Sequence, residues 1–365
     1  MARILLPTIE APGFKGGVAR YIEGIVKTFP GNVEIAAFDV MPSYNELFSL
    51  YWQRREDYDQ LWIHHVLPFG TAALAAKLLG GKPYVIFLHG LDFDLARQGF
   101  IRRELTKRIL RLAKKVVTNS QALADEVSTF VPGVTPLVVY PCVADEMVKS
   151  AEDCFTELAK TEGIAIDEVR EEKTNEKPGS DSVVGEARTG LRLLTVARLV
   201  ERKGHLLVLE AIKNLPGVTY DIIGDGPYRK IIEEKIAELG LRNRVTVHSI
   251  IENAALAQFY RDADLFVMPA KKSATDREGF GIVYLEAGLF GLPVVANNTP
   301  GVDEAVVDGV TGKLIDGSVA DLTKAIEGYM NDDRLGREQG QKGRERVLAE
   351  FTRLAQMSKL DELLS

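Results

Sequence analysis

Residues 265–296 constrain the fold more than any other stretch of the chain. Two short apolar runs, Leu265–Met268 and Val294–Ala296, have the form of buried strands. A polar loop and a helical segment, Ile282–Phe290, separate them, and Gly291 follows as a helix C-cap. Because neighbouring strands joined through a helix are parallel, this stretch predicts part of an α/β sheet.

The same alternation of apolar runs and helical patterns extends along most of the chain. Further strands are expected at Arg3–Thr8, Val33–Phe38, Leu61–Ile63, Tyr84–Leu88, Val116–Thr118, Leu137–Tyr140, Leu191–Val196, Asp221–Ile223 and Val245–His248. Helices are expected between several of them, as at 18–29, Thr71–Leu79 and Ile101–Leu112. This pattern is typical of parallel sheets with helices on both faces, and 365 residues suffice for two domains. We predict an N-terminal domain over 1–145 and a C-terminal domain over 191–349.

The segment between these domains, 146–190, breaks the rhythm. Met147, Ala151, Phe155 and Leu158 fit one helical face, but the residues after them read as a solvated loop. From residue 145 to 190 there are thirteen acidic and six basic residues, a balance that equals the net charge of −7 of the whole chain. We interpret the segment as an acidic insertion in the crossover between domains, outside both cores and of unknown purpose. The rest of the chain sums to zero charge and does not disfavour anionic ligands.

Composition also bears on the compartment. The chain has no run of 18 apolar residues, and its first residues lack the features of a secretion signal. Cys142 and Cys154 are the only cysteines, which favours free thiols in a reducing compartment. We therefore expect a cytoplasmic protein without a membrane-spanning helix.

The loop before residue 282 has the chemistry of a phosphate and sugar site. Gly279, Phe280 and Gly281 precede a helix whose free N–H groups and dipole favour an anion. Glu278 stands beside them, and Glu286 follows eight residues later. Two carboxylates on either side of a phosphate site suit the hydroxyl groups of a nucleotide sugar. A plain surface loop with a helix-capping glutamate fits the same residues.

Three other strand ends carry candidate groups. Arg198 and Lys203 lie between a strand and a helix, where two cations can stabilise a departing diphosphate; solvated side chains are the alternative. Gly16 and Gly17 follow the first strand, and Gly224 and Gly226 follow a later one. Both pairs let a ligand approach the backbone, although glycines at these places also occur in ordinary turns.

A histidine also ends a predicted strand. His89 follows Tyr84–Leu88, and ligands of open α/β sheets gather at the carboxyl ends of strands. A histidine satisfied by a nearby carbonyl is the alternative. His64 and His65 also end a strand, and we interpret them as structural.

The stretch EGFGIVYLEAGLFGLPVVA resembles the signature of the family 4 (group 1) retaining glycosyltransferases, and RLVERKG is a second match. The resemblance implies the GT-B fold, an α/β architecture in which two doubly wound Rossmann-like domains face each other across a cleft. It also implies that a C-terminal helix, 350–365, crosses back to the first domain. Leu354, Met357, Leu360 and Leu363 give that helix an apolar face.

The resemblance assigns roles to the candidate residues. It implies that Glu278 contacts the donor sugar, that Glu286 binds the donor ribose, and that Arg198 and Lys203 grip the diphosphate. It implies that His89 reaches the sugar from the first domain. The remaining donor-binding positions that it implies are Gly16, Gly17, Gly224, Gly226, Gly279, Phe280, Gly281 and Ile282.

The implied reaction is transfer of a hexose from a nucleotide diphosphate sugar to a glycan or lipid-linked acceptor. It implies no metal and no cofactor beyond the donor itself. Asp92-Phe93-Asp94 resembles a metal-binding motif of other glycosyltransferases, but Asp262-Ala263-Asp264 shows how easily that pattern arises. Pro300 stands where the family usually has a glycine, so the shape of that loop stays open.

Two other functions fit the same fold. A non-hydrolysing nucleotide-sugar epimerase would need an acid–base set that the sequence does not reveal. A sugar-nucleotide-binding protein without catalysis is disfavoured by the complete set Glu278, Arg198 and Lys203. No nucleic-acid partner is expected.

One predicted helix bears on where in the cell the protein acts. In 101–116, Ile101, Leu105, Ile109 and Leu112 share one face, and most other positions are basic. Such a helix can dock on an anionic membrane, here the inner face. Ordinary packing of the apolar face on a sheet is the alternative.

Overall fold

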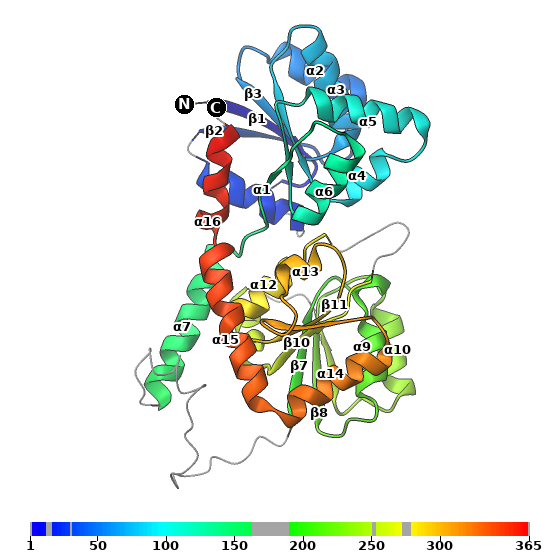
Figure 1. The fold of residues 1–365 in the computed structure, drawn as a ribbon, viewed down its shortest axis with the longest axis vertical. Helices are drawn as coiled ribbons and strands as arrows, with labels where there is room; N and C mark the ends of the chain where they lie inside the picture. Colours follow the sequence, from blue (N-terminus) through cyan, green and yellow to red (C-terminus); the bar gives the residue numbers. More distant parts are fainter. Residues whose placement is uncertain are drawn as a thin grey trace. The chain divides into compact units, whose positions relative to one another are not determined.

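The computed structural model describes residues 2–11, 17–29, 31–162, 190–249, 253–271 and 279–363. The chain forms two compact units, one of Met1–Ala144 with Phe351–Ser365 and one of Asp145–Glu350. Each unit holds a six-stranded sheet whose neighbouring strands are all parallel, which confirms the predicted α/β fold (Figure 1). Gly16, Glu278, Leu364 and residues 163–189 of the acidic segment lie outside the described residues.

The sheet of the first unit has the order β2-β1-β3-β4-β5-β6. Its strands are β1 (Arg3–Thr8), β2 (Asn32–Ala37), β3 (Gln60–Ile63), β4 (Tyr84–Leu88), β5 (Lys115–Thr118) and β6 (Leu137–Val138). Its helical elements are α1 (Gly17–Thr28), α2 (Tyr44–Gln53), the π-type turn η1 (Val66–Gly70), α3 (Thr71–Leu78), α4 (Leu91–Ala96), α5 (Phe100–Leu112) and α6 (Gln121–Phe130). Helix α2, which begins at a capping box formed by Ser43 and Glu46, was not predicted from the sequence.

Successive residues of each central strand point to opposite faces of this sheet, and both faces are buried. Leu61 and Ile63 of β3 face a core closed by helices α2 to α6. Trp62, between them, faces a second core with α1. A strand buried on both sides reads as a continuous apolar run, which is why the short strands were visible in the sequence.

The C-terminal residues complete the second core of the first unit. The predicted continuous helix is instead α16 (Arg353–Met357) followed by the 3₁₀-helix η3 (Ser358–Leu363). Met357, Leu360 and Leu363 are buried, whereas Leu354 is 77% exposed, contrary to the prediction. Leu360 and Leu363 share one face of the 3₁₀-helix, in which residues three apart align, whereas Leu354 lies outside it, in the first turn of α16.

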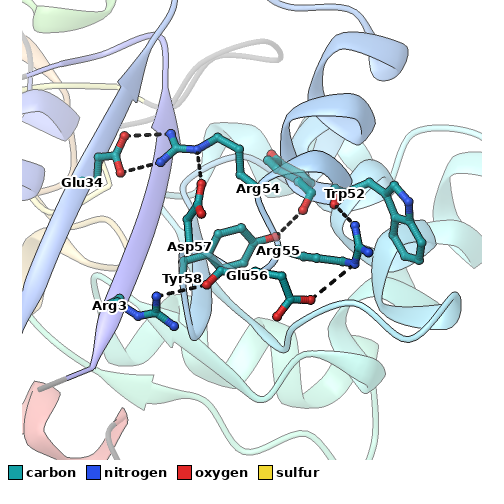
Figure 2. A network of polar contacts seen from close by, with 9 residues as sticks. Arg3, Glu34, Trp52, Arg54, Arg55, Glu56, Asp57 and Tyr58 are labelled. Atoms are coloured by element: carbon teal, nitrogen blue, oxygen red, sulfur yellow. Dashed lines mark hydrogen bonds and ion pairs between the residues drawn. The ribbon is translucent and has the colours of Figure 1, made fainter.

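A surface network ties the turn after α2 to the edge of the same sheet (Figure 2). Arg54 donates two hydrogen bonds of 2.7 Å to the carboxylate of Glu34 in β2 and one of 3.0 Å to Asp57. Arg3 of β1 donates to the carbonyl of Glu56 at 3.0 Å. Because these side chains are partly exposed, the network fixes the path of the turn more than it adds stability.

The sheet of the second unit has the order β12-β11-β10-β7-β8-β9. Its strands are β7 (Leu191–Val196), β8 (Val218–Ile223), β9 (Val245–His248), β10 (Leu265–Met268), β11 (Val294–Asn297) and β12 (Gly312–Ile315). Its helices are α7 (Asp145–Glu162), the 3₁₀-turn η2 (Glu201–Lys203), α9 (His205–Ile212), α10 (Arg229–Glu238), α11 (Asn253–Asp262), α12 (Ile282–Leu289), α13 (Val302–Ala305), α14 (Val319–Asn331) and α15 (Asp333–Glu350). Helices α9, α10 and α14 pack on one face, where they lie together in Figure 1.

Helix α7 comprises the first residues of the segment that was predicted to be an insertion outside both cores. In the structure, α7 instead belongs to the second unit and packs on α11 and α12. Met147 and Ala151 are buried. The Arg344 guanidinium of α15 lies 3.9 Å from the centre of the Phe155 ring, a cation–π contact that holds α7 in place.

Small residues bring α12 and α15 together. A Cβ atom added at Gly340 of α15 would lie 1.8 Å from the carbonyl oxygen of Gly291, just after α12. A Cβ atom added at Gly343 would meet only ordinary contacts, the nearest at 3.5 Å from Gly288. Arg344 adds a hydrogen bond of 2.6 Å to the carbonyl of Leu289.

These two glycines give a matched test of the packing. Gly340→Ala should lower the free energy of unfolding by about 2 kcal/mol, because the backbones must move apart. Gly343→Ala should leave it unchanged or raise it by up to about 1 kcal/mol, because alanine favours the helix. Urea denaturation followed by circular dichroism measures both, and equal stability of the two variants would contradict the close contact at Gly340.

Candidate active site

The carboxyl ends of three neighbouring strands of the second unit, β10, β7 and β8, form one edge of its sheet. The loop after β7 is bonded to the loops on either side. Leu199 donates its N–H to the carbonyl of Asp225 at 2.9 Å, and Tyr228 donates to the carbonyl of Leu199 at 3.0 Å. On the other side, Lys271 donates to the carbonyl of Arg202 at 2.7 Å. The predicted phosphate-gripping loop is therefore held by backbone bonds at both ends.

Glycines make this close approach of loops feasible. Added Cβ atoms at Gly224 and Gly226 would lie 1.9 Å and 2.3 Å from the carbonyl oxygens of Ala197 and Leu199. Gly204 has φ +78°, and a Cβ atom there would lie 2.5 Å from the carbonyl oxygen of Pro269. The protein's own backbone thus explains these glycines, in addition to any approach to a nucleotide.

The two predicted cations differ in their surroundings. Arg198 is exposed at the surface of this loop, whereas Lys203 is only 8% exposed. His205 follows at the start of α9, and burial, with a smaller effect from Lys203, lowers the pKa of its imidazole to about 4. The loop therefore offers one basic side chain at the surface and one that is buried.

The glycine turn before α12 is built around Tyr284. Gly281 has φ +85°, and a Cβ atom there would lie 2.4 Å from the Tyr284 ring. The Tyr284 hydroxyl donates to the carbonyl of Met268 at 2.8 Å and so ties α12 to the end of β10. Phe280 is buried, and Gly279 and Ile282 are partly buried. The start of α12 consequently lies at the same sheet edge as the loop with Arg198.

Glu286 is a buried carboxylate within α12, only 2% exposed. The Tyr260 hydroxyl of α11 donates to its Oε2 at 2.9 Å. The Tyr260 ring stacks on Phe290, with ring centres 5.3 Å apart. A buried carboxylate is stable only when it is hydrogen-bonded, so Tyr260 orients Glu286. Tyr260 was not among the predicted site residues, because the spacing of residues within a motif gives no signal for a bond from another helix.

In the first unit, His89 lies at the end of β4, as predicted. Its Nε2 is 3.0 Å from Nδ1 of His64, which follows the neighbouring strand β3. The Tyr21 ring of α1 packs edge-on against His89, with ring centres 5.3 Å apart. His64 thus has a specific partner within the candidate site. Gly17, the other predicted position of this unit that the structure describes, begins α1.

Asp92 supports the same strand end. Its Oδ1 accepts the backbone N–H of His89 at 2.9 Å. Burial raises the pKa of the Asp92 carboxyl to about 7, although bonds from backbone N–H groups, that of His89 foremost, oppose the shift. Asp94 pairs instead with Arg97 at 2.5 Å. Across the described ranges, no group of three or more His, Cys, Asp or Glu side chains is placed to hold a metal ion.

The basic helix α5 packs differently from the prediction at its first turn. Ile109 is buried and Leu105 is partly buried against the core, whereas Ile101 is 81% exposed. Phe100 beside it is 79% exposed. No helix in the described part of the chain is both long and apolar enough to cross a membrane. Neither Cys142 nor Cys154 is part of a disulfide bond, in line with the thiols expected from the sequence.

Two family profiles match the chain. The profile described as "Glycosyl transferases group 1" matches residues 180–346, and "Glycosyltransferase Family 4" matches residues 40–146. The GDP-mannose-dependent alpha-(1-6)-phosphatidylinositol monomannoside mannosyltransferase of Mycolicibacterium smegmatis is 27% identical over 99% of this chain and 98% of that protein. The N-acetyl-alpha-D-glucosaminyl L-malate synthase of Bacillus anthracis is 26% identical over 82% of this chain and 72% of its own length.

Solved structures share the fold. HepE of Anabaena, in complex with UDP, superposes with a TM-score of 0.76 and 21% identity, covering 100% of this chain and 99% of that chain. Sucrose-phosphate synthase from Thermosynechococcus elongatus gives a TM-score of 0.73 and 19% identity, covering 100% and 98%. With the two family matches, which together span most of both units, this chain belongs to the group 1, or family 4, glycosyltransferases and has their GT-B fold.

Proposed function

We propose that the chain transfers a hexose, with retention of anomeric configuration and without a metal ion, from a nucleotide diphosphate sugar to an acceptor hydroxyl. One observation carries the proposal. The loop with Arg198 and Lys203 is bonded on both sides at the sheet edge where α12 begins and Glu286 is held. A preorganised pair of cations near a helix N-terminus suits a departing diphosphate.

In this proposal the two carboxylates and His89 hold the donor. Glu286 accepts hydrogen bonds from the ribose hydroxyls, and Glu278 orients the sugar. His89 contacts the sugar as well. The bond from the anomeric carbon to the diphosphate oxygen breaks while the acceptor oxygen bonds to that carbon on the same face. The acceptor proton passes to the departing phosphate oxygen, so no protein nucleophile is required.

The acceptor we propose is a lipid-linked sugar. The Mycolicibacterium relative is named for a phosphatidylinositol mannoside acceptor, and α5 places exposed apolar and basic side chains together on the first unit. The relatives' names differ in the sugar, and the Mycolicibacterium relative is named for GDP-mannose whereas HepE was solved with UDP. A thermal-shift panel of nucleotide sugars is therefore the direct way to identify the donor. We propose that the enzyme works at the cytoplasmic face of the membrane.

Incubation with the donor alone tests the reaction class. Slow release of free sugar and nucleoside diphosphate is expected, because water can replace the acceptor. Glu278→Gln should cut this turnover about a hundredfold with nearly unchanged nucleotide affinity, the scale for losing a positioned transition-state contact. Asp276→Asn, in the same loop, is the control. Formation of an epimer would instead support an epimerase, and no turnover a binding protein.

A double-mutant cycle tests the diphosphate clamp. Arg198→Ala and Lys203→Ala should each weaken binding of nucleoside diphosphate about tenfold, as for a lost hydrogen bond to a charged group. The double variant should lose less than the sum of the two free energies, because both cations grip one group. Calorimetry measures the affinities, with Arg202→Ala as the control. Independent and negligible effects would remove both residues from the site.

Liposome flotation tests the membrane contact. Phe100 and Ile101 can enter the interface while Arg102, Arg108 and Arg111 meet anionic headgroups, at about 1 kcal/mol for each basic residue. Arg103 is a poorer choice for substitution, because its guanidinium packs 5.1 Å from the centre of the Phe130 ring. We expect binding to anionic vesicles at low salt and its loss at high salt.

Two variants and a control sharpen that measurement. One variant combines Phe100→Ser with Ile101→Ser, and the other replaces Arg102, Arg108 and Arg111 by Gln. Each should bind anionic vesicles more weakly than the wild-type protein. Lys230→Gln, an exposed change on the second unit, should not. If the wild-type protein stays unbound at low salt, the surface has another role and a soluble acceptor is favoured.

A further inference from the structure

The two histidines of the first unit that bond to each other indicate which ring nitrogen of His89 carries the proton. His64 and His89 follow neighbouring strands, and their ring planes differ by only 11°. The distance of 3.0 Å between Nδ1 of His64 and Nε2 of His89 is that of a hydrogen bond. Packing also holds the His64 ring, which stacks on the ring of Phe87 with ring centres 4.6 Å apart.

Both rings are neutral at physiological pH. Burial, with a smaller contribution from His65, lowers the pKa of His89 to about 3. Burial also lowers the pKa of His64 well below its usual value, and His89 and His65 lower it further. A neutral imidazole carries one N–H and one bare nitrogen, so a bond between two such rings has a direction.

There are two ways to place the protons. If His89 donates, the proton of His64 must sit on its Nε2, which is buried and has no hydrogen-bond partner among the described side chains and backbone. If His64 donates from Nδ1, its Nε2 is a bare acceptor instead. A buried N–H group without a partner is rarer in proteins than an unused acceptor, which favours donation by His64.

We propose that His64 is a positioning residue whose Nδ1–H donates to Nε2 of His89 and so fixes the His89 proton on Nδ1. Nδ1 is then the one ring nitrogen of His89 left for substrate, and it presents an N–H donor to an oxygen of the donor sugar. The inference rests on the proposed contact of His89 with that sugar. Donation from a ring already held in one tautomer requires no rearrangement when the sugar binds.

The surrounding groups fit this role. Asp92 bonds to the backbone of His89 and leaves both ring nitrogens of that residue to other partners. The Tyr21 hydroxyl donates to the carbonyl of Val139 at 2.9 Å, so it does not compete for His89. His65, the neighbour of His64, packs against Phe69 with ring centres 5.5 Å apart and makes no hydrogen bond to His89 among the contacts of the described residues. His65 is therefore a matched control.

Nitrogen-15 NMR of histidine-labelled protein reads the tautomer directly. The chain has five histidines, so single substitutions assign each signal. We expect His89 to carry its proton on Nδ1 in the wild-type protein, and to exchange between tautomers in His64→Leu. A wild-type His89 protonated on Nε2, or His89 signals that His64→Leu leaves unchanged, would overturn the inference.

Kinetics provide the second readout. His64→Leu should lower kcat for donor hydrolysis about tenfold, the usual scale for a residue that orients an active-site histidine. His64→Asn should recover most of it, because its amide nitrogen sits near the position of Nδ1 and can donate to His89. His65→Leu should keep wild-type kcat. Unchanged kcat in a folded His64→Leu protein would also overturn the inference.

The outcomes separate the two proposals. If His89→Leu retains wild-type turnover, the proposed contact of His89 with the sugar is wrong, whatever the NMR spectra show. If His89→Leu loses turnover while His64→Leu does not, His89 acts without help from His64 and only the positioning role fails.

Discussion

Direct contact between backbones at the carboxyl edge of the second sheet is the constraint on which the candidate site depends. The turns at Gly204, Gly224 and Gly226 lie against carbonyl groups of neighbouring loops, at distances where no side chain fits. Backbone bonds then fix the loop of Arg198 and Lys203 on both sides. A loop held in this way presents charge without the entropy loss of ordering it at each binding event, which is the benefit of preorganisation in a site for a departing anion.

Much of the fold was predictable, because strands buried on both faces are visible as apolar runs. The strands Tyr84–Leu88, Leu191–Val196, Val245–His248 and Leu265–Met268 have the predicted bounds. The errors have two causes, an overlooked local signal and a change of helix type. Helix α2 starts at the capping box of Ser43 and Glu46, a local signal that the prediction left out. The C-terminal segment changes from α to 3₁₀ geometry, which a periodicity of 3.6 residues does not reveal.

The candidate site also has a part that the sequence predicts and a part that it does not. Glycines and charged residues at strand ends were visible as motifs, and the family resemblance gave them expected roles. The partners that orient them were not visible, because Tyr260 reaches Glu286 from another helix and His64 reaches His89 from a neighbouring strand. Sequence spacing reports contacts within one element, whereas these bonds join residues that only the folded chain brings together.

The division of the chain between its units has a consequence for biosynthesis. The second unit is one continuous stretch, but the first is completed by residues 351–363, which are translated after it. Met357, Leu360 and Leu363 belong to the core that α1 closes on the first sheet. During synthesis the second unit can therefore fold while the first still exposes that apolar surface. In a nascent chain of this architecture, the N-terminal unit is the part that needs chaperone protection. That need ends only when the C-terminal residues have been synthesised and cover the apolar surface.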